Sequence, residues 1–101
     1  MSKAAEQEKL LFKLFVAGEE PNSVIAKKKL YELCDEIPEE EREILIIDVY
    51  QDYSVALEEG IVITPTLIAS RSDKQDRMVF FGNLQKSNQI EYYMKKGRKK
   101  L

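Results

Sequence analysis

Side chains that could do chemistry are scarce in this sequence of 101 residues, which contains no histidine and a single cysteine, Cys34. The lack of histidine excludes histidine-based acid–base catalysis, serine–histidine triads and histidine-ligated metal sites. One cysteine cannot form an intrachain disulfide, and apolar residues at helical spacing around Cys34 indicate a buried packing residue. Much of the usual enzyme repertoire is therefore absent.

Two oxygen-bearing side chains remain as candidates for chemistry. Asp48 lies at the end of a predicted strand, where α/β proteins often place functional groups. Because no second carboxylate, metal cluster or base accompanies Asp48, a capping or ion-pair role is the better interpretation. Ser23 is the only candidate nucleophile in the loop after the first predicted strand, and a poor one. We therefore predict no catalytic residue, no cofactor and no metal site.

The composition is that of an ordinary globular protein, with 44% hydrophobic and 34% charged residues. The formal net charge of −2, from 16 basic and 18 acidic residues, gives no argument for nucleic-acid binding. No apolar run approaches the roughly 20 residues of a membrane span, and the amino terminus lacks a signal-peptide pattern. We expect a cytoplasmic protein with a flexible amino terminus (1–9), one domain (10–95) and a basic tail (96–101) that is solvated or contacts an acidic partner.

Apolar runs and turn signals divide the chain into alternating strands and helices. The first half predicts a strand over residues 10–17, a helix that Asn22 or Ser23 caps and Pro38 ends, and a strand over residues 44–49. Because residues 44–49 are apolar on both faces, we expect them to form a central parallel strand.

The second half of the chain predicts shorter elements. They are a helix over residues 54–58 with Asp52 and Gly60 at its ends, a strand over residues 61–69 interrupted by Pro65, a polar loop over residues 70–76, a strand over residues 78–81, a turn at Gly82 and Asn83, and a final helix that Ser87 or Asn88 caps. Four tyrosines suit either an interface or partial burial in the core, namely Tyr50, Tyr53, Tyr92 and Tyr93.

The order strand–helix–strand–helix–strand–strand–helix predicts the fold class. A right-handed crossover makes the first two strands parallel, and the short loop between the last two makes them an antiparallel hairpin. This arrangement is an α/β, thioredoxin-like βαβαββα mixed sheet. In that fold a cis-proline stands beside the redox loop, so we expect a cis bond at Thr64–Pro65, with an edge-strand or bulge proline as the alternative.

The loop that would carry the redox cysteines of such a fold has none. Thioredoxin-like enzymes place their thiols where a helix amino terminus lowers the thiol pKa. Residues 18–23 read Gly-Glu-Glu-Pro-Asn-Ser at that place, and the two carboxylates would disfavour a thiolate. Thiol–disulfide chemistry is therefore excluded, and we expect the protein to act by binding a partner.

Five short motifs add a second line of inference. They are Val16-Ala17-Gly18, Pro21-Asn22-Ser23, Ile47-Asp48-Val49, Thr64-Pro65-Thr66-Leu67 and Phe81-Gly82-Asn83-Leu84. In this order and nearly this spacing, over about residues 10–95, they closely resemble the KaiB family of small proteins from the cyanobacterial circadian clock. The combination of V-A-G-x-x-P-N-S with T-P-T-L is specific, whereas either half alone is not.

The resemblance implies a non-enzymatic regulator that docks on a KaiC-type hexameric RecA-like ATPase and modulates its activity or signalling. It also implies fold switching between a thioredoxin-like state that binds KaiC and a βαββααβ ground state that self-associates as a dimer or tetramer. In the ground state residues 64–69 would be helical. The partner-binding candidates that the resemblance implies are Ala17, Gly18, Pro21, Asn22, Ser23 and Asp48, and the fold-switch candidates are Gly82 and Asn83.

Several positions depart from the clock pattern. Asn83 replaces the usual aspartate, Ile25 replaces a basic residue, and the polar residues 71–76 replace a proline-rich stretch. These differences favour a KaiB homologue outside the core clock, paired with its own KaiC-like ATPase. Two other functions stay open, a docking domain that acts with a histidine kinase or in stress response, and a residual enzyme that uses Ser23. The β-forming residues 62–68 favour the thioredoxin-like state.

Overall fold

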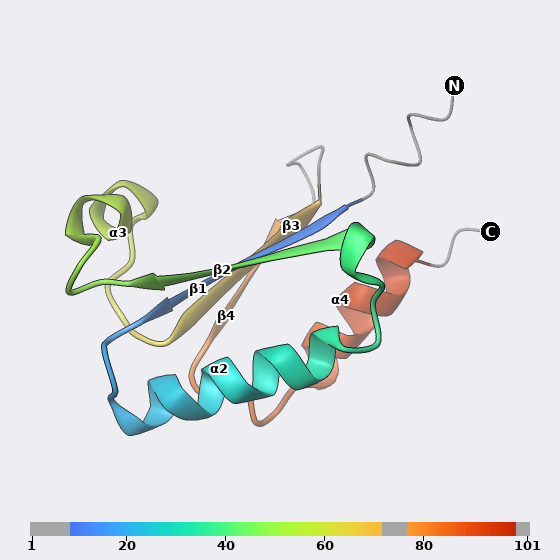
Figure 1. The fold of residues 1–101 in the computed structure, drawn as a ribbon, viewed down its shortest axis with the longest axis horizontal. Coiled ribbons are helices and arrows are strands. Elements are labelled where there is room, and N and C mark those ends of the chain that lie inside the picture. Colours follow the sequence, from blue (N-terminus) through green and yellow to red (C-terminus); the bar gives the residue numbers. More distant parts are fainter. Residues whose placement is uncertain (1–8, 72–76, 99–101) are drawn as a thin grey trace.

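A computed structural model describes residues 9–71 and 77–98 of the chain. Its elements follow the predicted order (Figure 1). They are β1 (Leu10–Val16), α2 (Pro21–Cys34), a short 3-10 turn η1 (Glu39–Glu41), β2 (Arg42–Asp48), α3 (Tyr53–Glu59), β3 (Thr66–Arg71), β4 (Arg77–Phe81) and α4 (Asn88–Arg98). The predicted flexible amino terminus, most of the predicted polar loop and the end of the basic tail lie outside the described residues.

The strands form one mixed sheet in the order β2-β1-β3-β4. β1 pairs in parallel with β2, and the pairs β1–β3 and β3–β4 are antiparallel. The thioredoxin-like βαβαββα arrangement predicted from the sequence is confirmed. The prediction that residues 44–49 form a central strand is wrong, because β2 is an edge strand and β1 and β3 take the two interior places. β2 is only partly buried, and its Leu45 is exposed.

The third strand is shorter at its start than the apolar run predicts. Residues 61–65 lie outside the sheet, and β3 begins at Thr66 and continues to Arg71. The Thr64–Pro65 peptide bond is cis, as expected. Pro65 has no N–H to donate to a ladder, so the strand starts directly after it instead of continuing through it. As a result Val62, predicted as a strand residue, is 88% exposed.

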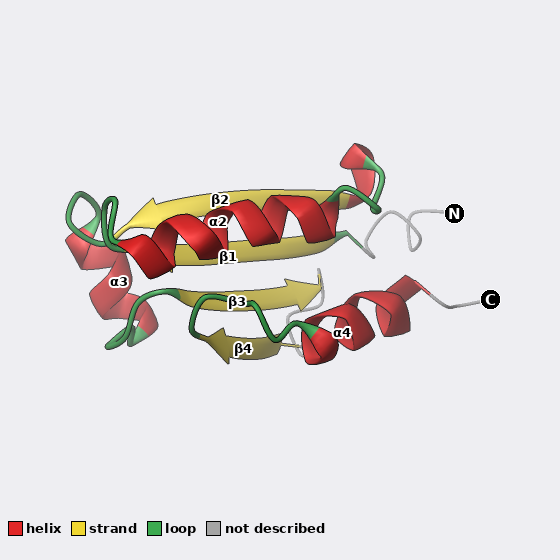
Figure 2. Cartoon of the chain, turned by 90° about the horizontal axis from the view of Figure 1, so that it is seen from below, coloured by secondary structure: helices red, strands yellow, loops and turns green. Residues whose placement is uncertain are grey.

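One face of the sheet carries the main core. α2 and α4 lie side by side on this face, with α2 over β1 and β2 (Figure 2). Alternate residues of β1 point into it, because side chains alternate between the two faces of a strand. Among the described residues, the cluster they build with the helices has fifteen buried members, including Phe12, Leu14, Leu30 and Ile90. Cys34 belongs to the same cluster, as its helical spacing predicts.

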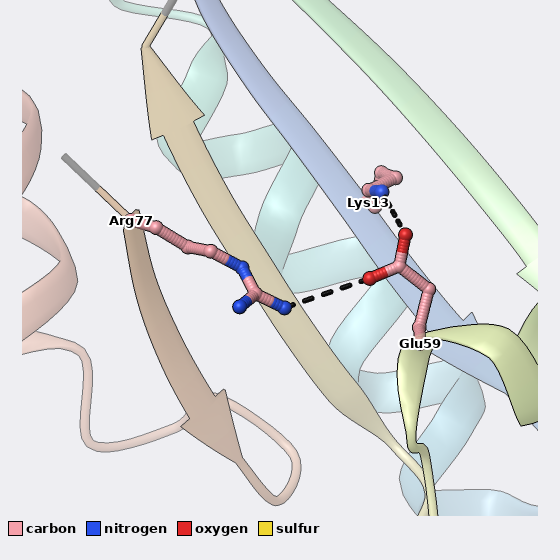
Figure 3. A network of polar contacts seen from close by, with 3 residues as sticks. All are labelled: Lys13, Glu59 and Arg77. Atoms are coloured by element: carbon pink, nitrogen blue, oxygen red, sulfur yellow. Dashed lines mark hydrogen bonds and ion pairs between the residues drawn. The ribbon is translucent and has the colours of Figure 1, made fainter. Parts of the chain in front are cut away.

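The opposite face of the sheet is covered by α3 at one end only. Phe15, Ala56 and Ile68 form a small buried cluster there. Beside it, the Glu59 carboxylate pairs with the Lys13 ammonium, and its other oxygen lies 3.5 Å from the Arg77 guanidinium (Figure 3). Glu59 therefore ties the end of α3 to β1 and β4 across the face that no other described helix covers.

Two helix ends differ from the prediction. α2 is capped by Glu20, whose Oε1 accepts a hydrogen bond from the Ser23 N–H at 2.9 Å, and not by Asn22 or Ser23. The helix ends at Cys34, before Pro38 is reached.

The other two helices lie close to where they are predicted. Asp52 and Gly60 flank α3 as predicted, although Asp52 makes no capping hydrogen bond and Gly60 takes the left-handed conformation with φ 74°. α4 begins at Asn88 and extends to Arg98, so it includes the first residues of the basic tail.

The buried thiol of Cys34 gives a test of this packing. Desolvation by burial raises its pKa to about 11, although the nearby Arg42 charge lowers it in part. We expect the folded protein at pH 8 to react with a disulfide reagent such as dithionitrobenzoate at least ~1000-fold more slowly than the chain in guanidinium, because thiolate formation needs local opening. Stopped-flow absorbance measures both rates.

A matched control places a thiol on the surface. In the Cys34→Ala background, Tyr92→Cys puts a cysteine at an exposed position of α4, and it should react at the rate of a free thiol. Equal rates for Cys34 and this control in the folded state would contradict the burial of Cys34.

Candidate partner-binding surface

The predicted site residues gather at the carboxyl ends of β1 and β2, where the chain turns into α2. Gly18 makes the turn with φ 52°, a conformation that residues with a Cβ adopt only with strain. A Cβ at Gly18 would also lie 3.4 Å from the Tyr50 ring. Ala17 is held from both sides, because its N–H donates to Ser23 Oγ at 3.0 Å and its C=O accepts from the Glu20 N–H at 3.1 Å. The turn is therefore a closed, hydrogen-bonded unit.

Asp48 joins this turn to the one that follows β2. Its Oδ1 accepts hydrogen bonds from the Gly18 N–H at 3.2 Å and from the Tyr50 N–H at 3.0 Å. These are the contacts of a capping carboxylate, the role that the sequence favours for Asp48. One side chain thus binds the loop after β1 and the loop after β2 together. As a consequence, Tyr50 packs over Gly18.

Ser23 takes part in structure and does not point to solvent. Its side chain is fully buried, and its oxygen accepts the hydrogen bond from Ala17. A nucleophile must reach a substrate, so this geometry argues against the residual-enzyme alternative that uses Ser23. Cys34 lies at the other end of α2 from this loop. Among the described residues, no group of three or more His, Cys, Asp or Glu side chains is arranged to hold a metal ion.

The two fold-switch candidates contact two different segments. Asn83 Nδ2 donates to Asn22 Oδ1 at 3.1 Å, and the Gly82 N–H donates to the Pro65 C=O at 2.9 Å. Gly82 has φ 96°, and the backbone turns so sharply here that Leu84 also has a positive φ of 69°. The segment after β4 is therefore connected both to α2 and to the cis-proline turn.

An open apolar pocket of about 360 Å³ lies beside these loops. Its walls come from the ends of β1 and β2, from α3 and from the turn before the cis-proline, and its lining consists of Ala17, Val49, Tyr50, Tyr53, Ala56, Leu57, Ile61, Val62 and Thr64. Tyr50 is 76% exposed and Tyr53 is 66% exposed. A contiguous group of exposed apolar side chains is typical of an interaction site.

The structure divides the sequence-predicted residues into two groups. Pro21 and Asn22 are exposed, although Asn22 Oδ1 accepts a hydrogen bond from Asn83, whereas Ala17 and Ser23 are buried and hold the shape of the turn. The tyrosines also divide, because Tyr93 is buried in the core while Tyr50, Tyr53 and Tyr92 are exposed. Val62 and its neighbours were missed by sequence reasoning, which placed them in a strand. Pro65 was the signal that could have ended that strand.

Comparison with known proteins places this chain in a family. The sequence profile of the KaiB domain matches residues 13–94, which is most of the chain. The chain belongs to the KaiB family. A comparison with proteins of curated function found no sequence match.

Solved structures show the fold that this KaiB-family chain shares. It is similar to Fasciola hepatica thioredoxin, with 22% identity, a TM-score of 0.71 and coverage of 91% of this chain and 85% of that one. It is also similar to chloroplastic thioredoxin z, with 17% identity, a TM-score of 0.74 and coverage of 90% and 80%. A third similar structure is Malassezia sympodialis thioredoxin, with 16% identity, a TM-score of 0.70 and coverage of 94% of this chain and 83% of that one. At these identities the likeness shows a thioredoxin-like fold and nothing about activity.

Family and fold together make this a regulatory protein of the KaiB type. The turn after β1, where the redox loop of a thioredoxin-like enzyme is expected from the sequence, is closed by the hydrogen bonds of Asp48, Ser23 and Glu20. No described helix is long and apolar enough to cross a membrane.

The double role of Asp48 gives a prediction. We expect Asp48→Ala to lower the free energy of unfolding by about 1–2 kcal/mol, because two N–H groups lose their acceptor. Asp48→Asn should cost less, since it retains a side-chain oxygen. Asp52→Ala is the matched control, because Asp52 is exposed and its side chain caps nothing, and its effect should stay within about 0.5 kcal/mol. Urea denaturation measures all three, and equal losses for Asp48→Ala and Asp52→Ala would refute this role.

Proposed function

We propose that this protein is a regulatory adaptor that docks on a KaiC-type hexameric RecA-like ATPase in the cytoplasm and modulates its activity or signalling. The observation that carries the proposal is the open pocket lined by Tyr50, Tyr53 and Val62, whose wall includes the family-motif residue Ala17. Family membership supports a KaiC-type partner, because KaiB proteins are known to interact with KaiC-type proteins.

The fixed positions of its tyrosines support the choice of this surface. Large aromatic side chains supply much of the binding energy of interfaces, and they bind best from a prearranged position. Tyr50 is prearranged, because its backbone N–H is bound by Asp48 and its ring lies against Gly18. Tyr53 is the first residue of α3, and Glu59 at the other end of this helix is tied to the sheet by its ion pairs. A partner that fills the pocket therefore meets side chains that are already held in place.

The same proposal includes the fold state. We assign docking to the thioredoxin-like state, since the pocket is built from elements that exist together only in this fold. Its walls include α3 and the turn before Pro65, and both belong to the segment whose structure the alternative ground state would change. A switch between the two folds, with the second one self-associated, would then regulate access to the pocket.

Docking is tested with the purified protein and a purified KaiC-type ATPase. We expect a complex in size-exclusion chromatography whose amount differs between ADP and ATP. The double variant Tyr50→Ala/Tyr53→Ala should weaken it by tenfold or more, because two central aromatic contacts are lost (about 1.4 kcal/mol per tenfold).

The control for that variant is Tyr92→Ala, which removes an exposed tyrosine from α4 outside the pocket. It should bind like the unaltered protein. The absence of any complex in both nucleotides would refute docking itself, whereas equal weakening by the two variants would refute this surface.

The resident fold is tested by NMR of the free protein. We expect secondary chemical shifts of a strand at Thr66–Arg71 and of a helix from Asn88 onward, because the local sequence prefers these states and the core uses them. The spectrum should keep this pattern when the sample is diluted. Helical shifts at residues 64–69, above all at high protein concentration, would show that self-association stabilises the other fold.

A further inference from the structure

The outer edge of β4 is open in the described part of the sheet. β4 pairs only with β3, since it is the last strand in the order β2-β1-β3-β4. The Gly82 N–H donates to the Pro65 C=O, which flanks the pair Thr66–Phe81. In an antiparallel ladder such flanking bonds mark a non-hydrogen-bonded pair. The backbone N–H and C=O groups of Phe81, and by alternation of Val79, therefore point away from β3 toward the open edge.

This edge lacks the usual protection against pairing. Natural edge strands carry a lysine, a proline or a bulge at the places where another strand could add. Between Arg77 and Phe81 the sequence of β4 is Met-Val-Phe, and the pairing with β3 runs without a bulge. Val79 is exposed, and Phe81 is 65% exposed. An added strand would cover both side chains.

A groove of about 470 Å³ runs beside the edge. One wall is the end of β4, and the other is the following loop with the start of α4. The lining residues are Val79, Phe80, Phe81, Gly82, Asn83, Leu84, Gln85, Lys86, Gln89 and Ile90. An extended chain along β4 would direct alternate side chains into this groove toward Phe80 and Ile90, and the others toward Val79 and Phe81.

We propose that this groove binds an extended peptide segment of a partner protein, which adds to β4 as an antiparallel strand and places an acidic residue beside Lys86. An acidic residue suits the groove by charge complementarity, because Lys86 is the one charged side chain among the lining residues that the structure describes. A second copy of this chain is a poorer occupant. Two five-residue edges bury far less than the roughly 800 Å² per partner of a stable dimer, whereas peptide strands bind by edge addition.

This surface is separate from the proposed ATPase-docking pocket. The two cavities share no lining residue, and the pocket lies at the ends of β1 and β2 while β4 is the opposite edge strand. The inference therefore goes beyond the proposed function and can hold if that function fails. A protein with both surfaces could attach a second protein to its ATPase.

The probe is a fluorescein-labelled decapeptide of alternating valine and threonine with two aspartates at its amino end. Antiparallel addition places that end beside the carboxyl end of β4, near Lys86. We expect saturable anisotropy with the intact protein, and backbone amide shifts confined to residues 77–90. The same peptide with two lysines in place of the aspartates should bind about two- to fivefold more weakly at low salt, and Lys86→Gln should remove that difference.

Two variants of Val79 separate backbone pairing from side-chain contact. Val79→Pro removes one outward N–H at an edge position that tolerates proline, and it should weaken peptide binding by about tenfold or more. Val79→Thr keeps the N–H and should bind within about twofold of the unaltered protein. Circular dichroism checks that both variants fold, and if Val79→Pro does not, the amide shifts of the unaltered protein decide.

Three results would overturn the inference. One is no binding of the aspartate peptide at millimolar concentration, and another is amide shifts that fall on β2 instead of β4. The third is a concentration-dependent dimer without peptide whose amide shifts map to β4, since a second copy would then occupy the edge.

Discussion

The burial of β1 on both faces is the constraint on which the other elements depend. β1 lies between β2 and β3, and Phe12 and Phe15 from its opposite faces are both fully buried. One face needs α2 and α4 to cover it, and the other needs α3. Lys13 interrupts the second face with a charge in the middle of the central strand. The Glu59 carboxylate pairs with it, and because Glu59 is the last residue of α3, the ion pair ties that end of α3 to β1.

The position of α3 in turn determines the candidate docking surface. α3 has one buried residue, Ala56, and two turns of helix contribute little packing by themselves. The contact of Glu59 with Lys13 and Arg77 is partly exposed, so its contribution is modest and depends on salt. The start of the helix is held by the backbone, because Asp48 C=O accepts from the Gln51 and Asp52 N–H groups. Tyr53 and Leu57 are thus presented on a helix that is tethered at both ends but lightly packed.

The fold was predictable from the sequence because local signals and element order agree. Glycine and proline mark most boundaries, and apolar periodicity separates helices from strands. What could not be predicted depends on neighbours distant in sequence. Residues 44–49 look buried on both faces, yet only the pairing of β1 with both β2 and β3 decides which strand is central. In the same way, Ser23 suits a helix cap, but the turn at Gly18 brings the Ala17 N–H to its hydroxyl and leaves Glu20 as the cap.

The missing cysteine pair has a physical counterpart in that turn. In a thioredoxin-like enzyme the positive end of the helix after β1 stabilises a thiolate. Here the Glu20 carboxylate accepts from the Ser23 N–H, so a built-in anion already occupies the amino terminus of α2. The neighbouring Asn22 is left to bind Asn83 from the segment after β4, at 3.1 Å. The start of α2 therefore carries a capping carboxylate and a hydrogen bond between the two halves of the chain, where a thioredoxin-like enzyme carries a reactive thiol. Any rearrangement of the segment after β4 would have to break that hydrogen bond to the start of α2.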